Sequence, residues 1–396
     1  MALRAPTRAD AVTMVLTRLA LFDFRSYAAA EITPDAGLTV VAGPNGTGKT
    51  NLLEAIHATI VGRSHRAGTD VELVRHGAPF ARIRLELAGG TAIELVVPGA
   101  EPGGVRKRLI VNGVPRRTST LSEVARVVLF RPEEMLLLVG SPGDRRRFLD
   151  GIVAQRDRRA ARDLVEVARV VAQRNALLRA IRAEEASLDA LGFWDEQLAQ
   201  IGARVMRARL EVLAGLVVRI GPLHGSVATD GEWDAAVGLT YVDALKDAWP
   251  DRSDPGVRIP TDDELAAAYR HRIGEVRQKE AWNGVSLVGP QRDDLRAELG
   301  GRDVATHASR GQQRTIILAM KLAETDLLGV DGPRPIVLLD DVFSELDPDR
   351  ASRLSELLTR RGQVIVTTAD PGTLEDARRR DAAVWRIVDG RLVREA

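Results

Sequence analysis

Residues 38–55 read LTVVAGPNGTGKTNLLEA, and the rest of the chain is organised around this stretch. Its first five residues, Leu38 to Ala42, are mostly apolar and predict a buried strand. Glycines at 43, 46 and 48 predict a tight loop, after which apolar residues return at helical spacing from Leu52. The stretch therefore predicts a strand, a glycine-rich loop and a helix in direct succession.

The loop carries the Walker A spacing Gly43-x4-Gly48-Lys49-Thr50. Its glycines can take positive φ and have no Cβ, so backbone N–H groups can turn toward a triphosphate, and the helix start adds positive potential. Lys49 would contact the β and γ phosphates, and the Thr50 hydroxyl would bind Mg²⁺. An ordinary glycine-rich turn is the alternative, which the flanking strand and helix disfavour. The residues predicted to bind ATP here are Gly43, Pro44, Asn45, Gly46, Thr47, Gly48, Lys49, Thr50 and Asn51.

The composition is that of a soluble globular protein. The 396 residues are enough for two or three domains, and 56 basic residues against 55 acidic ones leave a formal net charge of +1. Bulk charge therefore does not indicate a nucleic-acid binder. Because the chain has no cysteine, disulfides and thiolate metal sites are excluded. The chain has no long uninterrupted apolar run and no signal-peptide pattern, so we expect a cytoplasmic protein with no membrane segment.

The first part of the chain predicts a sheet-rich half-domain. Residues 1–13 show no periodicity and are expected to form a flexible tail. Strands are predicted from Val15 to Phe22 and at 38–42, and the alternation over 81–97 with Gly89-Gly90 between its halves predicts a hairpin. Further strands are predicted at 108–112, closed by Asn112-Gly113, and at 127–130. Residues 14–142 would thus be a nucleotide-binding half with an antiparallel β lobe.

A helical insertion follows. Residues 144–188 and 193–220 repeat apolar residues with helical period, and Thr261 begins a third helix as an N-cap. A strand is also predicted at 237–242. The α/β pattern returns near Leu287, with strands expected at 294–299, 336–339 and 364–367, helices at 312–328 and 350–359, and a closing hairpin at 384–393. The domain limits are therefore 143–285 for the insertion and 286–396 for the second half of the nucleotide fold.

A second apolar strand supplies the partner of the Walker A loop. Residues 336–341 read IVLLDD, so Asp340 would emerge at the carboxyl end of a buried strand, where ligands of open α/β sheets bind. Asp340 would hold Mg²⁺ with Thr50, and Asp341 would be the catalytic base, with Lys49 as the other catalytic residue. Alone, such a strand end is a weak signal, since buried strands often end in an acidic residue.

Two further motifs complete a known order. Ser309-Arg310-Gly311-Gln312 opens the helix of residues 312–328, and its free N–H groups offer a second anion site, although an ordinary serine cap explains the same residues. Ser344-x-x-Asp347 follows the acidic strand end. The order resembles that of ATP-binding-cassette proteins, in which Ser309, Gly311 and Gln312 would complete the ATP site of another subunit. One copy of each motif then implies an ATP-dependent homodimer.

Longer stretches resemble the RecF family of bacterial DNA replication and repair proteins, relatives of the SMC heads. The matching stretches are LALFDFRSY (19–27), GPNGTGKTNLLEAIH (43–57), GRSHR (62–66), VVLFRPEEMLLLVGSPGDRRRFLD (127–150), VAQRNALL (171–178), GPQRDDL (289–295), SRGQQRTIILAMKLAE (309–324) and LLDDVFSELD (338–347). The resemblance implies an ABC/SMC-like α/β ATPase head, with a mixed sheet, an antiparallel β lobe and a helical insertion domain.

The same resemblance implies a function. The chain would be an ATP-dependent protein that binds double-stranded DNA near single-strand gaps, dimerises with ATP, hydrolyses it slowly and helps to load recombinase, with RecR and RecO as partners. Three departures from the wider cassette class favour a slow switch: Asp341 replaces a glutamate, Thr368-Ala369-Asp370 replaces a histidine, and no glutamine of a Q-loop is evident near residues 130–134. Gln291 stands where the family often has histidine, and its role is open.

The DNA surface is predicted from local arginine clusters, because arginine-rich helices can track phosphates. A solvated face or a set of carboxylate partners is an equally open reading of such residues. The candidates at the start of the insertion are Arg145, Arg146, Arg147, Arg156 and Arg159, with Arg158 and Arg162 beside them.

Three other classes of protein remain as alternatives. A transporter ATPase subunit would not need so long an insertion, and an SMC protein would need several hundred residues of heptad repeat there. A structural nucleotide-binding adaptor would lack ATP hydrolysis.

Overall fold

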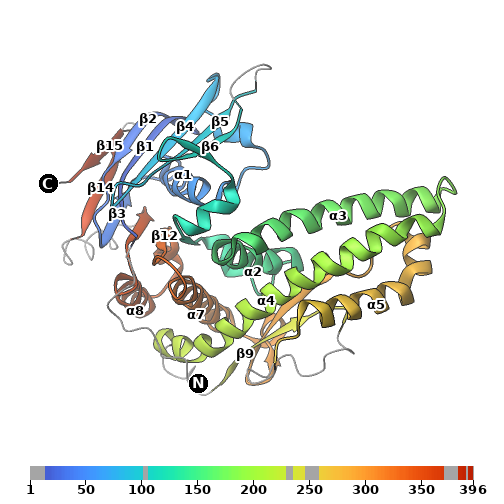
Figure 1. Ribbon diagram of the computed structural model, residues 1–396. Helices are drawn as coiled ribbons and strands as arrows, with labels where there is room; N and C mark the ends of the chain where they lie inside the picture. The colour runs from blue at the N-terminus through green and yellow to red at the C-terminus, as the bar shows by residue number, and fades with distance from the viewer. Residues whose placement is uncertain are drawn as a thin grey trace. The chain divides into compact units, whose positions relative to one another are not determined.

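The computed structural model describes residues 14–100, 106–228, 235–245, 258–369, 382–388 and 391–395 (Figure 1). The chain divides into two compact units: Met1–Met135 with Lys321–Ala396, the sheet unit, and Leu136–Met320, the helical unit. Outside the described residues lie the predicted tail 1–13, Asp370, the turn Asp389-Gly390 and most of the loop before Pro260.

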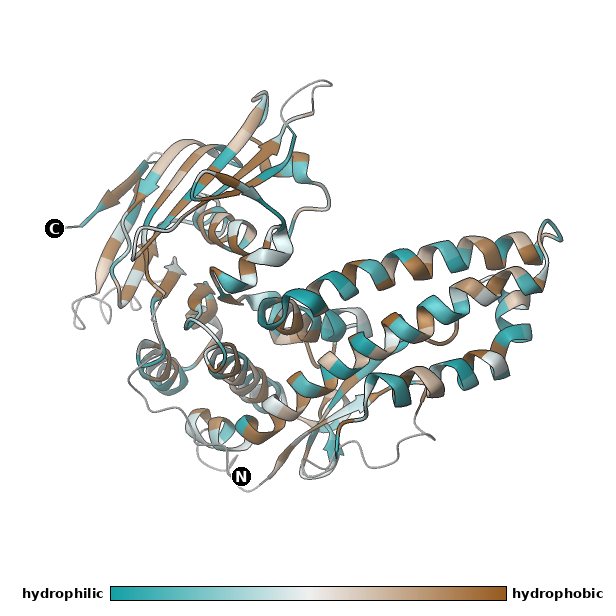
Figure 2. Ribbon diagram, viewed as in Figure 1, coloured by the Kyte–Doolittle hydropathy of each residue, from teal (hydrophilic) through white to brown (hydrophobic). Residues whose placement is uncertain are grey.

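One sheet of the sheet unit is antiparallel throughout, in the order β2-β1-β4-β5-β6-β7. The predicted β lobe and its hairpins are confirmed. Along β4 every second residue is buried, because successive side chains point to opposite faces. Hydrophilic and hydrophobic bands on the strands of this sheet are visible in Figure 2. The strands are β1 (Leu16–Phe24), β2 (Tyr27–Ile32), β4 (Phe80–Leu87), β5 (Ala92–Pro98), β6 (Arg108–Val111) and β7 (Val114–Arg116).

The second sheet has the order β15-β14-β3-β13-β12-β8, and its pairs are parallel except β14 with β15. Its central strands are buried on both faces, which explains their unbroken apolar runs. The strands are β3 (Leu38–Ala42), β8 (Val127–Phe130), β12 (Ile336–Asp340), β13 (Val364–Thr368), β14 (Ala383–Val388) and β15 (Arg391–Arg394).

Helix α1 (Lys49–Val61) contacts strands of both sheets, and its apolar residues belong to one core with them. The side chain of Gln363 also joins the sheets, because it accepts a bond from the Leu16 N–H (2.7 Å) and donates to the Leu16 carbonyl (2.8 Å). The other helices of this unit are α8 (Pro348–Thr359) and the 3-10 turns η1 (Asp70–Leu73), η2 (Thr118–Glu123), η3 (Pro132–Leu136) and η7 (Val342–Glu345).

The helical unit contains the predicted long helices and a three-stranded antiparallel sheet in the order β11-β10-β9. Ser141, Asp157 and Thr261 cap the starts of α2, α3 and α5 with their side chains. The elements are α2 (Pro142–Arg156), α3 (Arg158–Arg182), η4 (Leu188–Leu191), α4 (Gly192–Val227), β9 (Val237–Val242), α5 (Asp262–Asn283), η6 (Pro290–Arg292), β10 (Asp294–Leu299), β11 (Arg302–Asp303), α6 (Val304–His307) and α7 (Arg310–Leu328), the last of which ends in the sheet unit.

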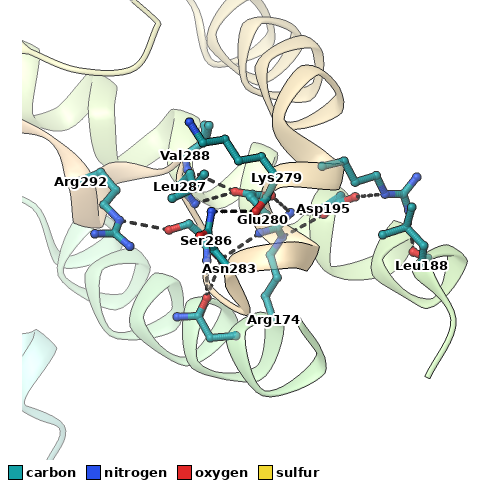
Figure 3. A network of polar contacts seen from close by, with 12 residues as sticks. Arg174, Leu188, Asp195, Lys279, Glu280, Asn283, Ser286, Leu287, Val288 and Arg292 are labelled. Carbon is teal, nitrogen blue, oxygen red and sulfur yellow. Dashed lines mark hydrogen bonds and ion pairs between the residues drawn. The ribbon is translucent and has the colours of Figure 1, made fainter. Parts of the chain in front are cut away.

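Charged groups form part of the core of the helical unit (Figure 3). Arg174 of α3 is fully buried and donates to Asp195 of α4 (2.9 Å), to Glu280 of α5 (2.6 Å) and to the Ser286 hydroxyl (2.8 Å). Glu280 in turn accepts the backbone N–H of Leu287 (2.6 Å). One buried network therefore joins three helices to the turn that follows α5.

Segment Leu188–Val227, which contains α4, is long and apolar enough to cross a membrane by length and composition. Core helices of folded units pass the same test. Helix α4 packs against α3 and α5, and many of its side chains are buried, including that of Arg209. It therefore has the contacts of a core helix. It also extends past the predicted end at Ile220 and includes Pro222.

The predicted limits of the insertion, 143 and 285, differ from the division into units. The helical unit begins at Leu136 and extends to Met320. The strand predicted at 294–299 forms, but it pairs with β9 and β11 rather than with the nucleotide sheet. The sequence pattern of residues 294–299 predicts a strand, but it does not identify the strand with which these residues pair. Helix α7 also begins earlier than predicted, at Arg310.

Candidate nucleotide-binding site

The glycine-rich loop leaves β3 at the carboxyl edge of the parallel sheet. Ala42 lies opposite Thr368 of β13, and Asp340 of β12 lies opposite Thr367, so the loop and the acidic strand end share this edge. Gly48 has φ 105°, and a Cβ there would lie 2.9 Å from the Ser26 Oγ and 3.0 Å from the Tyr27 hydroxyl oxygen. Only glycine fits this position without strain.

Gly46 also takes a positive φ, but Gly43 does not, contrary to the expectation for all three glycines. A Cβ on Gly43 would lie 3.0 Å from the Thr47 Oγ1, so close approach within the loop explains that residue. The Thr47 hydroxyl donates to the carbonyl of Pro44 (2.9 Å) and braces the same turn.

Lys49 is buried, and its ammonium lies inside the loop. It donates to the carbonyls of Gly43 (2.7 Å) and Pro44 (2.9 Å). Burial lowers its pKa, and the carboxylates of Asp341 and Asp340 act in the opposite direction. Two weakly basic carbonyls are poor partners for a buried ammonium compared with a phosphate, so the loop suits a polyphosphate anion.

Thr50 and Asp340, far apart in sequence, are brought together as predicted. The Thr50 hydroxyl donates to Asp340 Oδ1 (3.0 Å), and the Thr367 hydroxyl donates to the same oxygen (2.7 Å). A hydroxyl and one carboxylate are the small ligand set that Mg²⁺ uses when substrate phosphates and water complete its octahedron. The described residues contain no group of three or more acidic or histidine side chains able to hold a metal by themselves.

Asp341 has φ 52°, a left-handed conformation uncommon outside glycine. Its N–H bonds to the Thr367 carbonyl (3.1 Å) and hydroxyl (3.2 Å), which hold the residue in place. Ser344 donates to the Asp341 carbonyl (2.7 Å), and Asp347 caps α8. The Ser-x-x-Asp turn therefore fixes the backbone on which the predicted base stands. Backbone strain of this kind is typical of functional positions.

The signature residues Ser309, Gly311 and Gln312 lie in the helical unit, at the start of α7. The Gln312 N–H donates to the Ser309 Oγ (3.2 Å), and Gln312 Oε1 accepts the Ser309 N–H (2.9 Å). This is a capping box. Because the Ser309 oxygen accepts in the cap and its side chain is exposed, its hydroxyl proton can still be donated to an anion.

The arginines predicted to bind DNA have internal partners in several cases. Arg145 donates to both oxygens of Asp294 (2.7 and 2.8 Å), Arg146 to the Asp293 carbonyl (2.6 Å), and Arg147 to Asp144. Burial acts to raise the pKa of Asp294, but the hydrogen bonds from Arg145 and the Leu295 N–H, together with the charges of Arg145 and Arg146, hold this pKa below its ordinary value.

Arg145 and Arg146 thus hold Asp293 and Asp294 in place at the start of β10. For these two arginines the structure favours an internal structural role over contact with DNA. Arg159 is exposed, and Arg156 is half-buried.

Sequence reasoning missed two groups of supporting residues. Thr367 orients Asp340, and its only sequence signal is a hydroxyl at a strand end. Glu54 on α1 is fully buried and accepts bonds from Arg25 (2.9 and 2.7 Å) and the Ser64 hydroxyl (2.5 Å). Arg25 and Ser64 stand in stretches that carry the family resemblance, so that resemblance could have indicated them.

Gln291 has a structural role. Its side-chain amide donates to the Val288 carbonyl (3.0 Å) across the turn at Gly289, which has φ 130°.

Comparisons with known proteins agree with this geometry. A family model described as "RecF/RecN/SMC N terminal domain" matches residues 15–387. The DNA replication and repair protein RecF of Streptomyces avermitilis is 37% identical over 92% of this chain and 97% of its own length. That of Kineococcus radiotolerans is 40% identical over 90% and 93%.

Solved structures give the same result. One described as "the recombination mediator protein RecF-ATPrS in RecFOR pathway" has a TM-score of 0.84 and 26% identity, covering 98% of this chain and 99% of the other. The Smc head domain of Pyrococcus furiosus has a TM-score of 0.51 at 17% identity over 97% of each chain, and shares the fold alone. The chain belongs to the RecF family, with the SMC-like ATPase head that its sequence predicts.

Proposed function

We propose that this protein is an ATP-dependent DNA-binding recombination mediator of replication and gap repair. It binds double-stranded DNA near single-strand gaps, dimerises with ATP, hydrolyses it slowly and assists recombinase loading with RecR and RecO. The contact of Thr50 with Asp340 at the mouth of the Walker A loop carries the ATPase part of the proposal. Relatives named DNA replication and repair proteins support the rest.

Each residue of the site has a defined task. Lys49 moves from the loop carbonyls to the β and γ phosphates of ATP. Thr50 and Asp340 would hold Mg²⁺, which would supply the positive charge that neutralises those phosphates. Thr367 fixes the orientation of Asp340, and Asp341 orients the attacking water. Asp341 is shorter than a glutamate, so its carboxylate reaches less far, which supports slow turnover.

The site is completed by a second subunit in this proposal. Ser309, Gly311 and Gln312 form a helix start with an exposed serine, and the chain carries one such sequence for its one Walker A loop. Donation from the Ser309 hydroxyl and the free N–H groups of α7 to a γ phosphate held by the partner would make ATP part of the dimer interface. Binding of ATP would close two heads, and hydrolysis would release them.

A mixing experiment tests this arrangement. Lys49→Ala and Ser309→Arg each damage both sites of a homodimer, so each variant alone is expected to lose ATP hydrolysis. A mixed dimer joins the intact Lys49 of one chain to the intact Ser309 of the other, which restores one site. We expect the mixture to recover a substantial part of the ATPase rate. Activity in the Ser309→Arg variant alone equal to that of the parent, or no recovery in a mixture that forms dimers, would contradict the shared site.

The predicted DNA surface is narrowed by the ion pairs. Arg145 donates to Asp294 and Arg146 to the Asp293 carbonyl, so the exposed Arg159 is the candidate that we retain on the helical unit. Duplex binding should show little base preference and should weaken steeply with salt.

A further inference from the structure

The hairpin of β6 and β7 at the edge of the antiparallel sheet carries an unusual density of positive charge. Residues 106–108 read RKR and residues 116–117 read RR, and all five basic residues are exposed. Asn112 and Gly113 join the strands with φ 50° and 77°, the paired positive values of a two-residue type I′ turn. The hairpin is thus a short, well-defined ribbon that presents arginines from its base.

The other arginines of this sheet are neutralised by carboxylates. Arg18 pairs with Glu31 (2.7 Å) and Glu86 (3.2 Å), Arg82 with Glu94 (3.6 Å), and Arg84 with Glu86 (3.0 Å). The pairs of Arg18 and Arg82 join neighbouring strands, and that of Arg84 lies within β4. Strands β1, β2, β4 and β5 therefore add little net charge to their exposed faces.

The hairpin differs in this respect. Within the described residues, Arg106, Arg108, Arg116 and Arg117 (the hairpin arginines) have no ion pair with a carboxylate, and Lys107 has one, with Asp70 (2.7 Å). Four guanidinium groups with no carboxylate partner in the described part of the chain repel one another on this small ribbon. An anion bound from outside the chain would reduce that repulsion.

We propose that the hairpin arginines bind the phosphate backbone of double-stranded DNA. A guanidinium fork fits a phosphate with two parallel hydrogen bonds. Basic residues at 106, 107 and 108 lead into β6, and Arg116 and Arg117 lie at the end of β7, so the charges are spread over both arms of the hairpin and suit a charged polymer better than one small anion. The inference rests on the DNA binding proposed above and gives it a location in the sheet unit.

The absence of aromatic residues from the hairpin sequence favours duplex DNA over single-stranded DNA as its ligand. Single-strand sites combine positive charge with aromatic side chains on which bases stack. Residues 106–117 contain no aromatic residue. The hairpin is therefore built for backbone contacts, which position a protein on a duplex without reading its sequence.

A triple substitution tests the site. Arg108→Gln/Arg116→Gln/Arg117→Gln is compared with Arg18→Gln/Arg82→Gln/Arg84→Gln, which removes the same charge from paired arginines of the same sheet. Both are measured by fluorescence anisotropy with a short labelled duplex, in ATP and over a range of salt. We expect the hairpin variant to lose about tenfold or more in affinity and about 2 to 3 in the slope of log affinity against log salt, and the control to stay near the parent.

Binding of a fluorescent ATP analogue is measured in parallel and should be unchanged in the hairpin variant. Parent-like duplex affinity and salt slope in the hairpin variant would overturn the inference while leaving the proposed function intact. Aggregation of the hairpin variant with unchanged affinity would also overturn it, because it would show that these charges only protect the edge strand β7 from pairing. If the parent itself binds no duplex in ATP, the proposed function and the inference both fail.

Discussion

At the scale of single residues, several charged side chains of this protein are buried. Lys321 and Glu324 are both buried near the end of α7, and their charged groups lie 2.7 Å apart. Glu134, which follows β8, lies 3.4 Å from the same ammonium. Burial raises the pKa of Glu324 to about 7, although the nearby Lys321 acts to lower it. Glu324 therefore holds a proton more tightly in the folded chain than in the unfolded one.

This shift predicts a pH dependence of stability. Between pH 4.5 and about 7 the folded chain keeps a proton on Glu324 that the unfolded chain releases, so this contribution to stability is full at low pH and is lost as pH rises. Glu324→Gln removes the titration. We expect the free energy of unfolding of the variant, relative to the parent, to rise by about 3 kcal/mol from pH 4.5 to pH 8.

Urea unfolding of the Glu324→Gln variant and of the parent at several pH values measures this difference. The contributions of the other titrating groups cancel because both proteins contain them. Glu356→Gln on α8 is a suitable control, since Glu356 lies on a different helix and is exposed. A difference between Glu324→Gln and parent that does not change with pH would contradict the shift.

At the scale of elements, buried ion pairs join the helices of the helical unit. Arg174 ties α3 to α4 and α5 (Figure 3), and Arg209 of α4 ties to Asp150 of α2 (2.7 Å) and to the Pro290 carbonyl (2.7 Å). Both arginines also contact the segment between α5 and β10, Arg174 at Ser286 and Arg209 at Pro290, so this segment is tied to α3 and α4. Breaking a buried pair from one side leaves an uncompensated charge, which costs more than the pair contributed.

Arg174→Met is therefore expected to destabilise the helical unit by about 3–5 kcal/mol, because Glu280 is left buried without its cation. Adding Glu280→Gln should recover part of the loss, since the amide oxygen can still accept the Leu287 N–H without a charge. Urea unfolding followed by circular dichroism measures both.

The matched control is Arg270→Met, which breaks an exposed pair of α5 and α4 with Glu196 and should cost about 1 kcal/mol or less. An equal effect of Arg174→Met and Arg270→Met would show that the buried network is not what holds these helices.

At the scale of the whole molecule, the ATP site joins segments from the two ends of the chain. The parallel strands β3, β13 and β12 are neighbours, so Thr50 and Asp340 meet although 290 positions separate them. In the proposed function this half-site becomes complete only in a dimer, so association should follow the state of the nucleotide.

Asp341→Asn is expected to bind ATP but not to hydrolyse it, and so to remain a dimer in sedimentation experiments with ATP. Lys49→Ala is expected to stay monomeric under the same conditions because it cannot hold the phosphates. The parent should form dimers that decay as ATP is consumed. A strictly monomeric Asp341→Asn protein at high concentration with ATP would contradict nucleotide-driven dimerisation.

The sequence by itself determined the elements that depend on neighbours along the chain. Residues 38–50 predict strand, loop and helix start because glycine conformation, apolar period and capping are local properties. The hairpin at 81–97 and its turn glycines are predicted for the same reason, and so is the acidic end of β12. Resemblance to the RecF family then set the expectation for the fold as a whole.

Only the tertiary structure decided which distant groups become partners. The strand at 294–299 pairs with β9 in the helical unit, and Arg145 of the predicted DNA surface binds Asp294 instead. Thr367 and Glu54 became supporting residues through contacts that no local pattern encodes. The physical reason is that hydrogen-bond partners and burial depend on which surfaces the folded chain brings together, whereas periodicity records only which side of an element faces inward.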